Sequence, residues 1–213
     1  MSDLAFEVLD ARAEPYAAVP TIMIRLRITE RSGAPVHALA LRCQIRIEPQ
    51  LRRYAAEEEA RLVDVFGEPP QWGTSLSPFL WTHVATTLTG FTGVTEIDLP
   101  VTCTYDLEVA GTKYFHALDN GEIPLVLLFS GTTFVRGDTG VSVAPVAWHE
   151  DASYRLPVRV WRDMMDLYFP NSGWLMVSRD TLDALTRFKV ARALPTWDLV
   201  VERLLKEAGE EGA

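Results

Sequence analysis

Alternation of apolar and polar residues is the feature that most restricts the fold of this 213-residue chain. It runs through residues 22–29, 39–47 and 97–109. A period of two is that of a β-strand with one buried and one solvated face, because successive side chains point to opposite sides of a sheet. Residues 123–129 are apolar at every position, which is typical of a strand covered on both faces. The chain is therefore expected to build a mostly antiparallel β structure.

A turn-forming segment, residues 31–35, separates the first two alternating segments. It contains Gly33 and Pro35, and residues of these types interrupt regular structure and favour turns. Residues 22–29 and 39–47 are therefore predicted to pair with each other as a β-hairpin that has one buried and one wet face.

Helical spacing of apolar residues appears in one inserted segment and again near the C-terminus. Residues 51–66 show it first, and Gly67, with two prolines just beyond, predicts where that helix ends. From about residue 158 the period is helical again, and Ser178 and Thr196 are suited to cap two further helices. The sequence thus predicts about three C-terminal helices.

Together these elements predict an α+β fold, in which strands come first and most helices follow. The expected architecture is an antiparallel β-sandwich, or a strongly bent sheet, with one inserted helix and about three C-terminal helices. All residues, 1–213, are expected in a single domain. Its β-rich part is predicted over about residues 1–148 and its helical part over about residues 158–208.

Six arginines form the most informative polar set in the sequence. If the hairpin pairs as predicted, one outward face carries four of them and the chain runs directly into two more: Arg25, Arg27, Arg42, Arg46, Arg52 and Arg53. Like charges opposite one another across strands are unfavourable unless acidic groups answer them. In one interpretation, the acidic segment Glu57–Glu59, or the strand near Asp106 and Glu108, lies beside the arginines and offsets their charge. In the other, this face docks an acidic partner.

Trp72 is the best candidate for an exposed aromatic anchor. It lies in a loop, residues 67–78, that is rich in glycine, proline and serine. Tryptophan is enriched among the residues that contribute most to protein–protein binding. It also fills the ends of sandwich cores, so a structural role for Trp72 is the alternative.

Composition excludes several classes of protein. A net charge of −9 argues against nucleic-acid binding, which leaves a basic footprint. No apolar run reaches the roughly 20 residues of a membrane span, and residues 1–10 lack the basic start and apolar stretch of a signal peptide. Residues 1–53 hold eight arginines and six acidic residues, whereas the remainder is strongly acidic. We expect a cytoplasmic protein with neither nucleic acid nor membrane as partner.

No motif for phosphate binding, nucleophilic catalysis or metal binding is found in the sequence. The histidines lie far apart, at His37, His83, His116 and His149. Cys43 and Cys103 both fall on inward faces of predicted strands, where a cysteine behaves as a small hydrophobe. Both thiols are expected to be buried, unbridged and free of metal. The sequence predicts no catalytic residue, cofactor or metal, and it leans against an enzyme.

Several short sequence segments together resemble those of an uncharacterised bacterial protein family of similar length. They are LRCQIRIEP at residues 41–49, LVDVFG at 62–67, IPLVLLFSG at 123–131 and YFPN at 168–171. That family is associated with gene clusters for [NiFe]-hydrogenases and their accessory proteins. The resemblance implies an accessory or assembly role. It transfers no functional residue, because these segments carry no known chemistry.

Two functional hypotheses follow from the sequence. The first is a non-enzymatic accessory or assembly protein, acting through protein–protein interaction with an acidic patch on its partner. Its candidate docking residues are those identified above: Arg25, Arg27, Arg42, Arg46, Arg52, Arg53 and Trp72. The second is an enzyme or small-ligand-binding protein whose site is assembled from distant residues at a sheet end. A polar-lined pocket would favour the second hypothesis, and a flat exposed patch the first.

Overall fold

The structure is a computed structural model that describes residues 3–104, 109–137, 140–147, 149–170 and 176–209, with the backbone alone at 136 and 137. The chain divides into two compact units, Met1–Trp174 and Leu175–Ala213. Within the described residues, no helix is both long and apolar enough to cross a membrane.

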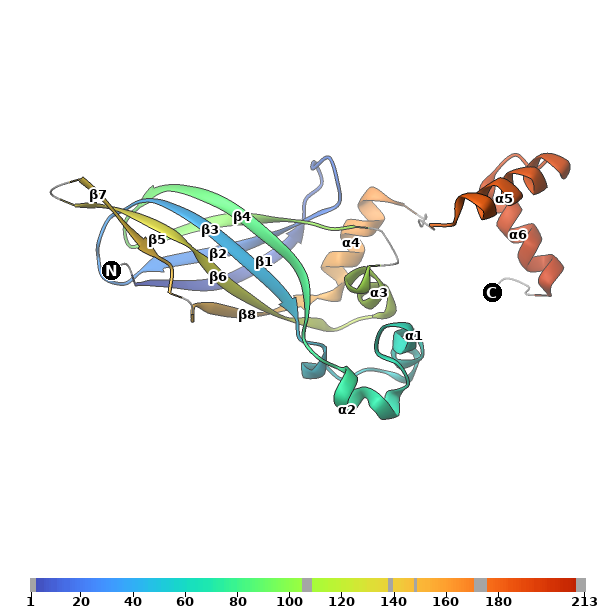
Figure 1. Cartoon of the computed structure of the whole chain (residues 1–213), viewed down its shortest axis with the longest axis horizontal. Coiled ribbons are helices and arrows are strands. Elements are labelled where there is room, and N and C mark those ends of the chain that lie inside the picture. Colours follow the sequence, from blue (N-terminus) through green and yellow to red (C-terminus); the bar gives the residue numbers. More distant parts are fainter. Residues whose placement is uncertain (1–2, 105–108, 138–139, 148, 171–175, 210–213) are drawn as a thin grey trace. The chain divides into compact units, whose positions relative to one another are not determined.

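The first unit contains two antiparallel sheets (Figure 1). The three-stranded sheet has the order β1-β2-β5, with bounds Leu4–Ala13, Thr21–Glu30 and Val94–Thr102. The five-stranded sheet has the order β4-β3-β6-β7, and β8 pairs with β6. Its strands are β3 (Val36–Ile47), β4 (Phe79–Phe91), β6 (Glu122–Gly137), β7 (Gly140–Pro145) and β8 (Asp151–Pro157). The predicted α+β sandwich is confirmed.

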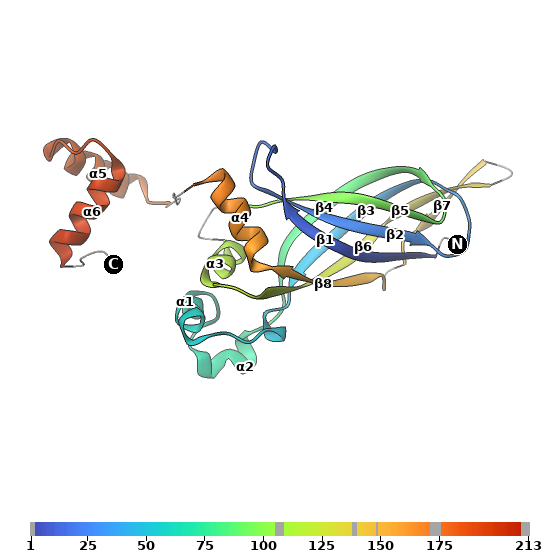
Figure 2. The ribbon, with the colours of Figure 1, turned by 180° about the vertical axis from the view of Figure 1, so that it is seen from behind.

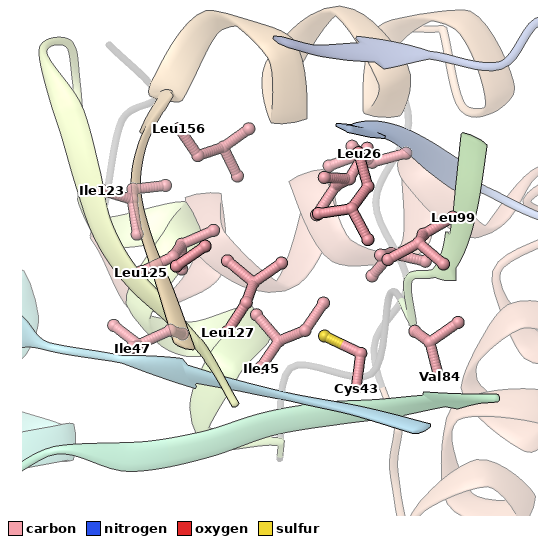
Figure 3. Packing of buried hydrophobic residues seen from close by; sticks show 14 of the residues in the cluster. Leu26, Cys43, Ile45, Ile47, Val84, Leu99, Ile123, Leu125, Leu127 and Leu156 are labelled. Carbon is pink, nitrogen blue, oxygen red and sulfur yellow. The ribbon is translucent and has the colours of Figure 1, made fainter. Parts of the chain in front are cut away.

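The core lies between the inner faces of the two sheets. The apolar members of residues 22–29 and 39–47 are buried there, as the alternation predicts, and so are Leu99, Val101 and Cys103. Figure 3 shows side chains from both sheets converging on one interior. The alternation at residues 97–109 extends beyond the strand, because β5 ends at Thr102 and Val109 is 42% exposed, while Tyr105 and Leu107 lie outside the described residues. Phe6 of β1 stacks on Phe129 of β6 with ring centroids 4.1 Å apart, which joins the two sheets directly. Outward side chains of the two sheets therefore lie on opposite sides of the sandwich.

Helices gather at one end of this sandwich, as both views show (Figures 1 and 2). They are α1 (Ala56–Phe66), α2 (Trp72–Ser75), α3 (Ala110–Ala117) and α4 (Val158–Tyr168), with short 3₁₀ turns at Pro49–Leu51 and Pro69–Gln71. Buried aromatic residues of these helices, among them Tyr114, Phe115 and Trp161, close that end of the core. The inserted helix was predicted to begin near residue 51 but begins at Ala56, because the chain first makes a 3₁₀ turn.

The second unit holds α5 (Arg179–Ala191) and α6 (Trp197–Ala208). Ser178 accepts a hydrogen bond from the N–H of Thr181, and Thr196 accepts one from Leu199, so both predicted N-caps are confirmed. Val200 is the only buried hydrophobic residue in the described part of this unit. That all 213 residues form one domain stays a prediction.

The predicted hairpin between residues 22–29 and 39–47 is wrong. These segments belong to β2 and β3, which lie in different sheets: β2 pairs with β1 and β5, and β3 pairs with β4 and β6. Alternation fixes which face of a strand is buried but not its neighbour. Residues 31–35 therefore carry the chain from one sheet to the other.

Both cysteines are buried and unbridged, as predicted. Desolvation by burial raises the pKa of Cys43 and of Cys103 to about 12. Since the thiolate is the reactive form, neither side chain is expected to react in the native state at neutral pH.

We therefore expect a bulky thiol reagent to label the native protein no faster than it unfolds. Labelling at pH 7.5, followed by intact mass, should give no adduct over an hour, and two adducts per chain in guanidinium chloride. A Cys43→Ser/Cys103→Ser variant serves as the blank. Rapid labelling of the native protein would contradict the buried positions of both thiols.

Candidate functional site

On the outer face of the three-stranded sheet, each arginine is already paired. Arg25 donates to Glu96 at 2.8 Å, and Arg27 donates to Glu96 at 3.0 Å and to Glu7 at 3.1 Å. Arg12 and Asp98 form a further pair at 2.7 Å. Hydrogen bonds from Arg25 and Arg27 lower the pKa of Glu96. Arg25 and Arg27 are thus neutralised by neighbouring strands rather than by the Glu57–Glu59 segment.

The outer face of the five-stranded sheet is different. Arg42 lies between Ala85 of β4 and Ser130 of β6, and Arg46 lies between Leu80 and Val126. Neither arginine has an acidic group within 4 Å among the residues that the structure describes. Leu80, opposite Arg46 on β4, is a large apolar residue that is 46% exposed.

The six candidate arginines therefore do not share one surface, which corrects the prediction. Arg25 and Arg27 project from β2, and Arg42 and Arg46 from β3, and the outer faces of these two strands lie on opposite sides of the sandwich. The prediction depended on a hairpin between the two strands, and that pairing does not exist.

Arg52 is an internal clamp. Its side chain is only 8% exposed, and its guanidinium donates to Glu58 at 2.6 Å and to the carbonyls of Asn120 and Glu122 at 2.8 and 3.0 Å. These contacts join the segment before α1 to the start of β6. Nε of Arg52 is buried and has no hydrogen-bond partner among the described residues.

Glu58 is the buried acidic partner in this clamp, with a side chain 4% exposed. Besides Arg52, it accepts the N–H of Asp119 at 2.9 Å and that of Ala55 at 3.2 Å. Desolvation by burial acts to raise the pKa of Glu58, but these hydrogen bonds outweigh it and lower the pKa. Glu58 is therefore an ionised structural group.

Trp72 is not an exposed anchor, and that expectation is wrong. Only 8% of it is exposed, and its indole N–H donates to the carbonyl of Gly67 at 2.7 Å. Its ring packs edge-on against Tyr54 and Phe66. The loop folds into a 3₁₀ turn and α2, which bring the indole into the core, so the alternative structural role applies.

Arg53 and Arg155 line a hollow of about 590 Å³ at a corner of the sandwich. Both are exposed, and neither has an acidic group within 4 Å among the described residues. Arg155 of β8 lies opposite Pro124, two residues beyond Ser153, which flanks Val126. Because Val126 is also the neighbour of Arg46, the hollow lies at the end of the outer face that carries Arg42 and Arg46.

We call this surface the arginine face and define it by Arg42, Arg46, Arg53 and Arg155. Sequence reasoning found the first three and missed Arg155. The missed signal was weak: in the short segment 151–157, Ala152 and Leu156 are buried, whereas Ser153 and Arg155 are exposed. A second hollow, of about 510 Å³, opens beside Arg42 where Ala40, Ala85 and Gly131 leave the sheet surface shallow.

Residues suited to metal or acid–base chemistry are scattered. Among the described residues no group of three or more His, Cys, Asp or Glu side chains could hold a metal ion. His116 packs edge-on against Trp161 at 4.6 Å between centroids, and burial together with Arg162 lowers its pKa. The other histidines lie in β3, in β4 and after β7. Asp106 and Glu108, considered above as partners for the arginines, lie outside the described residues.

The protein is therefore a two-sheet antiparallel sandwich with helices at one end, and on one of its two outer faces the arginines have no acidic group within 4 Å among the described residues. The chain belongs to DUF6084, a family of unknown function, whose sequence profile matches residues 1–213. This confirms an uncharacterised family, but its description carries no link to hydrogenases. No curated protein matches the chain.

Some solved structures show a distant likeness. The CARDB domain of a Pyrococcus furiosus protein, solved in complex with di-metal ions, is 10% identical with a TM-score of 0.28, over 73% of this chain and 87% of that one. A protein assigned to the late embryogenesis abundant class is 13% identical with a TM-score of 0.32, over 73% and 72% of the two chains. Scores this low transfer no site and no function.

Proposed function

We propose that this protein is a non-enzymatic accessory or assembly factor that binds an acidic patch on a partner protein through the arginine face. The partner's carboxylates would contact Arg42, Arg46, Arg53 and Arg155. The exposed apolar surface around Leu80 would lie at the same interface.

The observation that carries this proposal is the contrast between the two outer faces. Arg12, Arg25 and Arg27 each have a carboxylate of this chain within hydrogen-bond distance. The arginine face has none within 4 Å among the described residues, although the whole protein carries a charge of −9. Arg42 and Arg46 lie on β3 and Arg155 on β8, the two strands that flank β6, so these charges face the same side of the sheet. An acidic partner would supply the carboxylates that the described residues of this chain do not place beside them.

Arginine suits this role because its planar guanidinium binds a carboxylate through two parallel hydrogen bonds and is weakly hydrated. With the remainder of the molecule acidic, the arginine face would also orient the protein as it approaches an acidic surface. Such steering accelerates association and weakens as salt concentration rises.

The biological setting that we propose is bacterial and cytoplasmic: the maturation or assembly of a [NiFe]-hydrogenase. Its support is the resemblance of residues 41–49 and 123–131 to the bacterial protein family that is associated with [NiFe]-hydrogenase gene clusters. A host strain lacking this protein should then assemble less active hydrogenase, and the wild-type gene should restore the activity.

Two matched variants test the proposed binding face. Arg42→Gln/Arg46→Gln and Arg25→Gln/Arg27→Gln each remove two charges from the outer face of a central strand. After cross-linking in the native host, quantitative mass spectrometry should show a partner that the first variant loses by about tenfold or more. The second variant should retain it, and the captured amount should fall as salt rises.

Equal capture by both variants would contradict the arginine face. Loss in both would show that net charge, rather than this surface, controls capture. A small molecule co-purifying with the wild-type protein, with no partner protein, would favour the ligand-binding alternative.

A further inference from the structure

The corner hollow is bordered by Arg52, Arg53 and Arg155, by the acidic residues Glu58 and Glu122, and by the backbone around Gly121. Arg52 and Glu58 form an ion pair at 2.6 Å and so offset each other. Of the other charged residues that line the hollow, Arg53 and Arg155 have no acidic group within 4 Å among the described residues, and Glu122 carries the one remaining carboxylate. The hollow therefore keeps a net positive charge.

The base of the hollow is held in place by Arg52. Its guanidinium fixes the carbonyls of Asn120 and Glu122, so the segment entering β6 has little freedom to move. Gly121 has φ +79°, and a Cβ added there would lie 3.5 Å from Nη1 of Arg52. The glycine thus supplies a backbone conformation that other residues rarely adopt and leaves the hollow open.

The support for a ligand is the pair of exposed arginines at the hollow, Arg53 and Arg155, rather than the buried Arg52. The side chain of Arg52 is more than nine-tenths buried, and its Nε has no hydrogen-bond partner among the described residues. This Nε is shielded from solvent, so the donors that an acceptor in the hollow can reach are those of the two exposed arginines that line it. Arg53 and Arg155 are both exposed, and neither has an acidic group within 4 Å in the part of the chain that the structure describes.

We propose that the corner hollow is a specific binding site for the side-chain carboxylate of one Asp or Glu residue of the partner. This inference rests on the proposed function and deepens it: the arginine face attracts an acidic surface, and the hollow selects one residue of it. A volume of about 590 Å³ accommodates a side chain with adjoining backbone.

The test uses fluorescein-labelled alanine-rich peptides with both ends blocked, containing no Glu, one Glu or six Glu residues. Binding to the full chain is followed by fluorescence anisotropy. Arg53→Gln/Arg155→Gln changes the hollow, and Arg42→Gln/Arg46→Gln removes the same charge elsewhere on the arginine face. We expect the one-Glu peptide to bind saturably and to lose about tenfold or more in affinity with the first variant only.

The outcomes separate the inference from the function beneath it. If the six-Glu peptide binds and only Arg42→Gln/Arg46→Gln weakens it, the arginine face stands and the hollow is refuted. If neither variant weakens binding of the six-Glu peptide, both the arginine face and the hollow are refuted as binding surfaces. An unblocked all-Ala peptide that binds as well as the one-Glu peptide would assign the site to a chain terminus instead. Competition by inorganic phosphate but not by acetate would also overturn the carboxylate assignment.

Discussion

Replacing Arg52 by methionine is expected to lower the free energy of unfolding by about 3–5 kcal/mol. The change leaves Glu58 as an unpaired charge in a site where its side chain is 4% exposed. It also leaves the carbonyls of Asn120 and Glu122 without the donors that Arg52 supplies. Breaking a buried pair by removing one partner is costly because the remaining charge is stranded.

Urea denaturation followed by circular dichroism measures this effect, and a double-mutant cycle apportions it. Glu58→Met alone should also be destabilising. The combined Arg52→Met/Glu58→Met variant should be more stable than the sum of the two losses implies, because no charge is stranded. Arg25→Gln, which breaks an exposed pair, serves as the control and should change little. A loss no greater than that of the control would contradict the buried clamp.

The same clamp sets part of the acid sensitivity. The pKa of Glu58 is lower in the folded protein than its ordinary value of 4.5. The stability it contributes is therefore present above pH 4.5 and is lost as the pH falls through its folded pKa. Glu96, Asp98 and Asp119 also have lowered pKa values, so the wild-type protein loses stability in acid at several places. The difference between wild type and Glu58→Gln should shrink below pH 4.

Strand faces could be predicted from the sequence because burial determines them locally. Ile22, Ile24 and Leu26 are buried and alternate with the less buried Met23 and Arg25, because one side of β2 meets the core whichever strands lie beside it. Pairing could not be predicted in this way. The Arg31–Pro35 segment has the composition of a hairpin turn, but the choice between a hairpin and a change of sheet depends on contacts with β1 and β5.

The same distinction applies to the candidate site: the side of its strand that each arginine occupies could be predicted, but the grouping of the arginines on one surface could not. The outward position of Arg42 and Arg46 follows from alternation, although Arg46 is half-buried. Which arginines share a face depends instead on sheet order. Arg52 looked like Arg53 in the sequence, and only the position of Glu58, six residues on and folded back by α1, makes one internal and the other exposed. Helix α3 was missed because its residues 110–117 combine a turn-forming start with few apolar repeats.

The largest effect is expected on deleting α4. Four of its residues are almost fully buried in the core: Val158, Trp161, Met164 and Met165. Burying each such side chain is worth about 1.5–3 kcal/mol, so their sum reaches the 5–15 kcal/mol that a typical domain possesses. The hydroxyl of Tyr168 also donates to the carbonyls of Glu14 and Ala17. A fragment of residues 1–157 should therefore fail to fold.

A fragment of residues 1–175 keeps α4 and is the matched control. Among the described residues, the core of the first unit draws on none later than Phe169, so this fragment should be folded, with a melting temperature close to that of the full chain. Differential scanning calorimetry of both fragments and the full chain decides between the possibilities. A folded 1–157 fragment of unchanged stability would show that α4 is dispensable. Failure of the 1–175 fragment would instead show that residues 176–213 belong to the same cooperative unit as the sandwich, as the single-domain prediction requires.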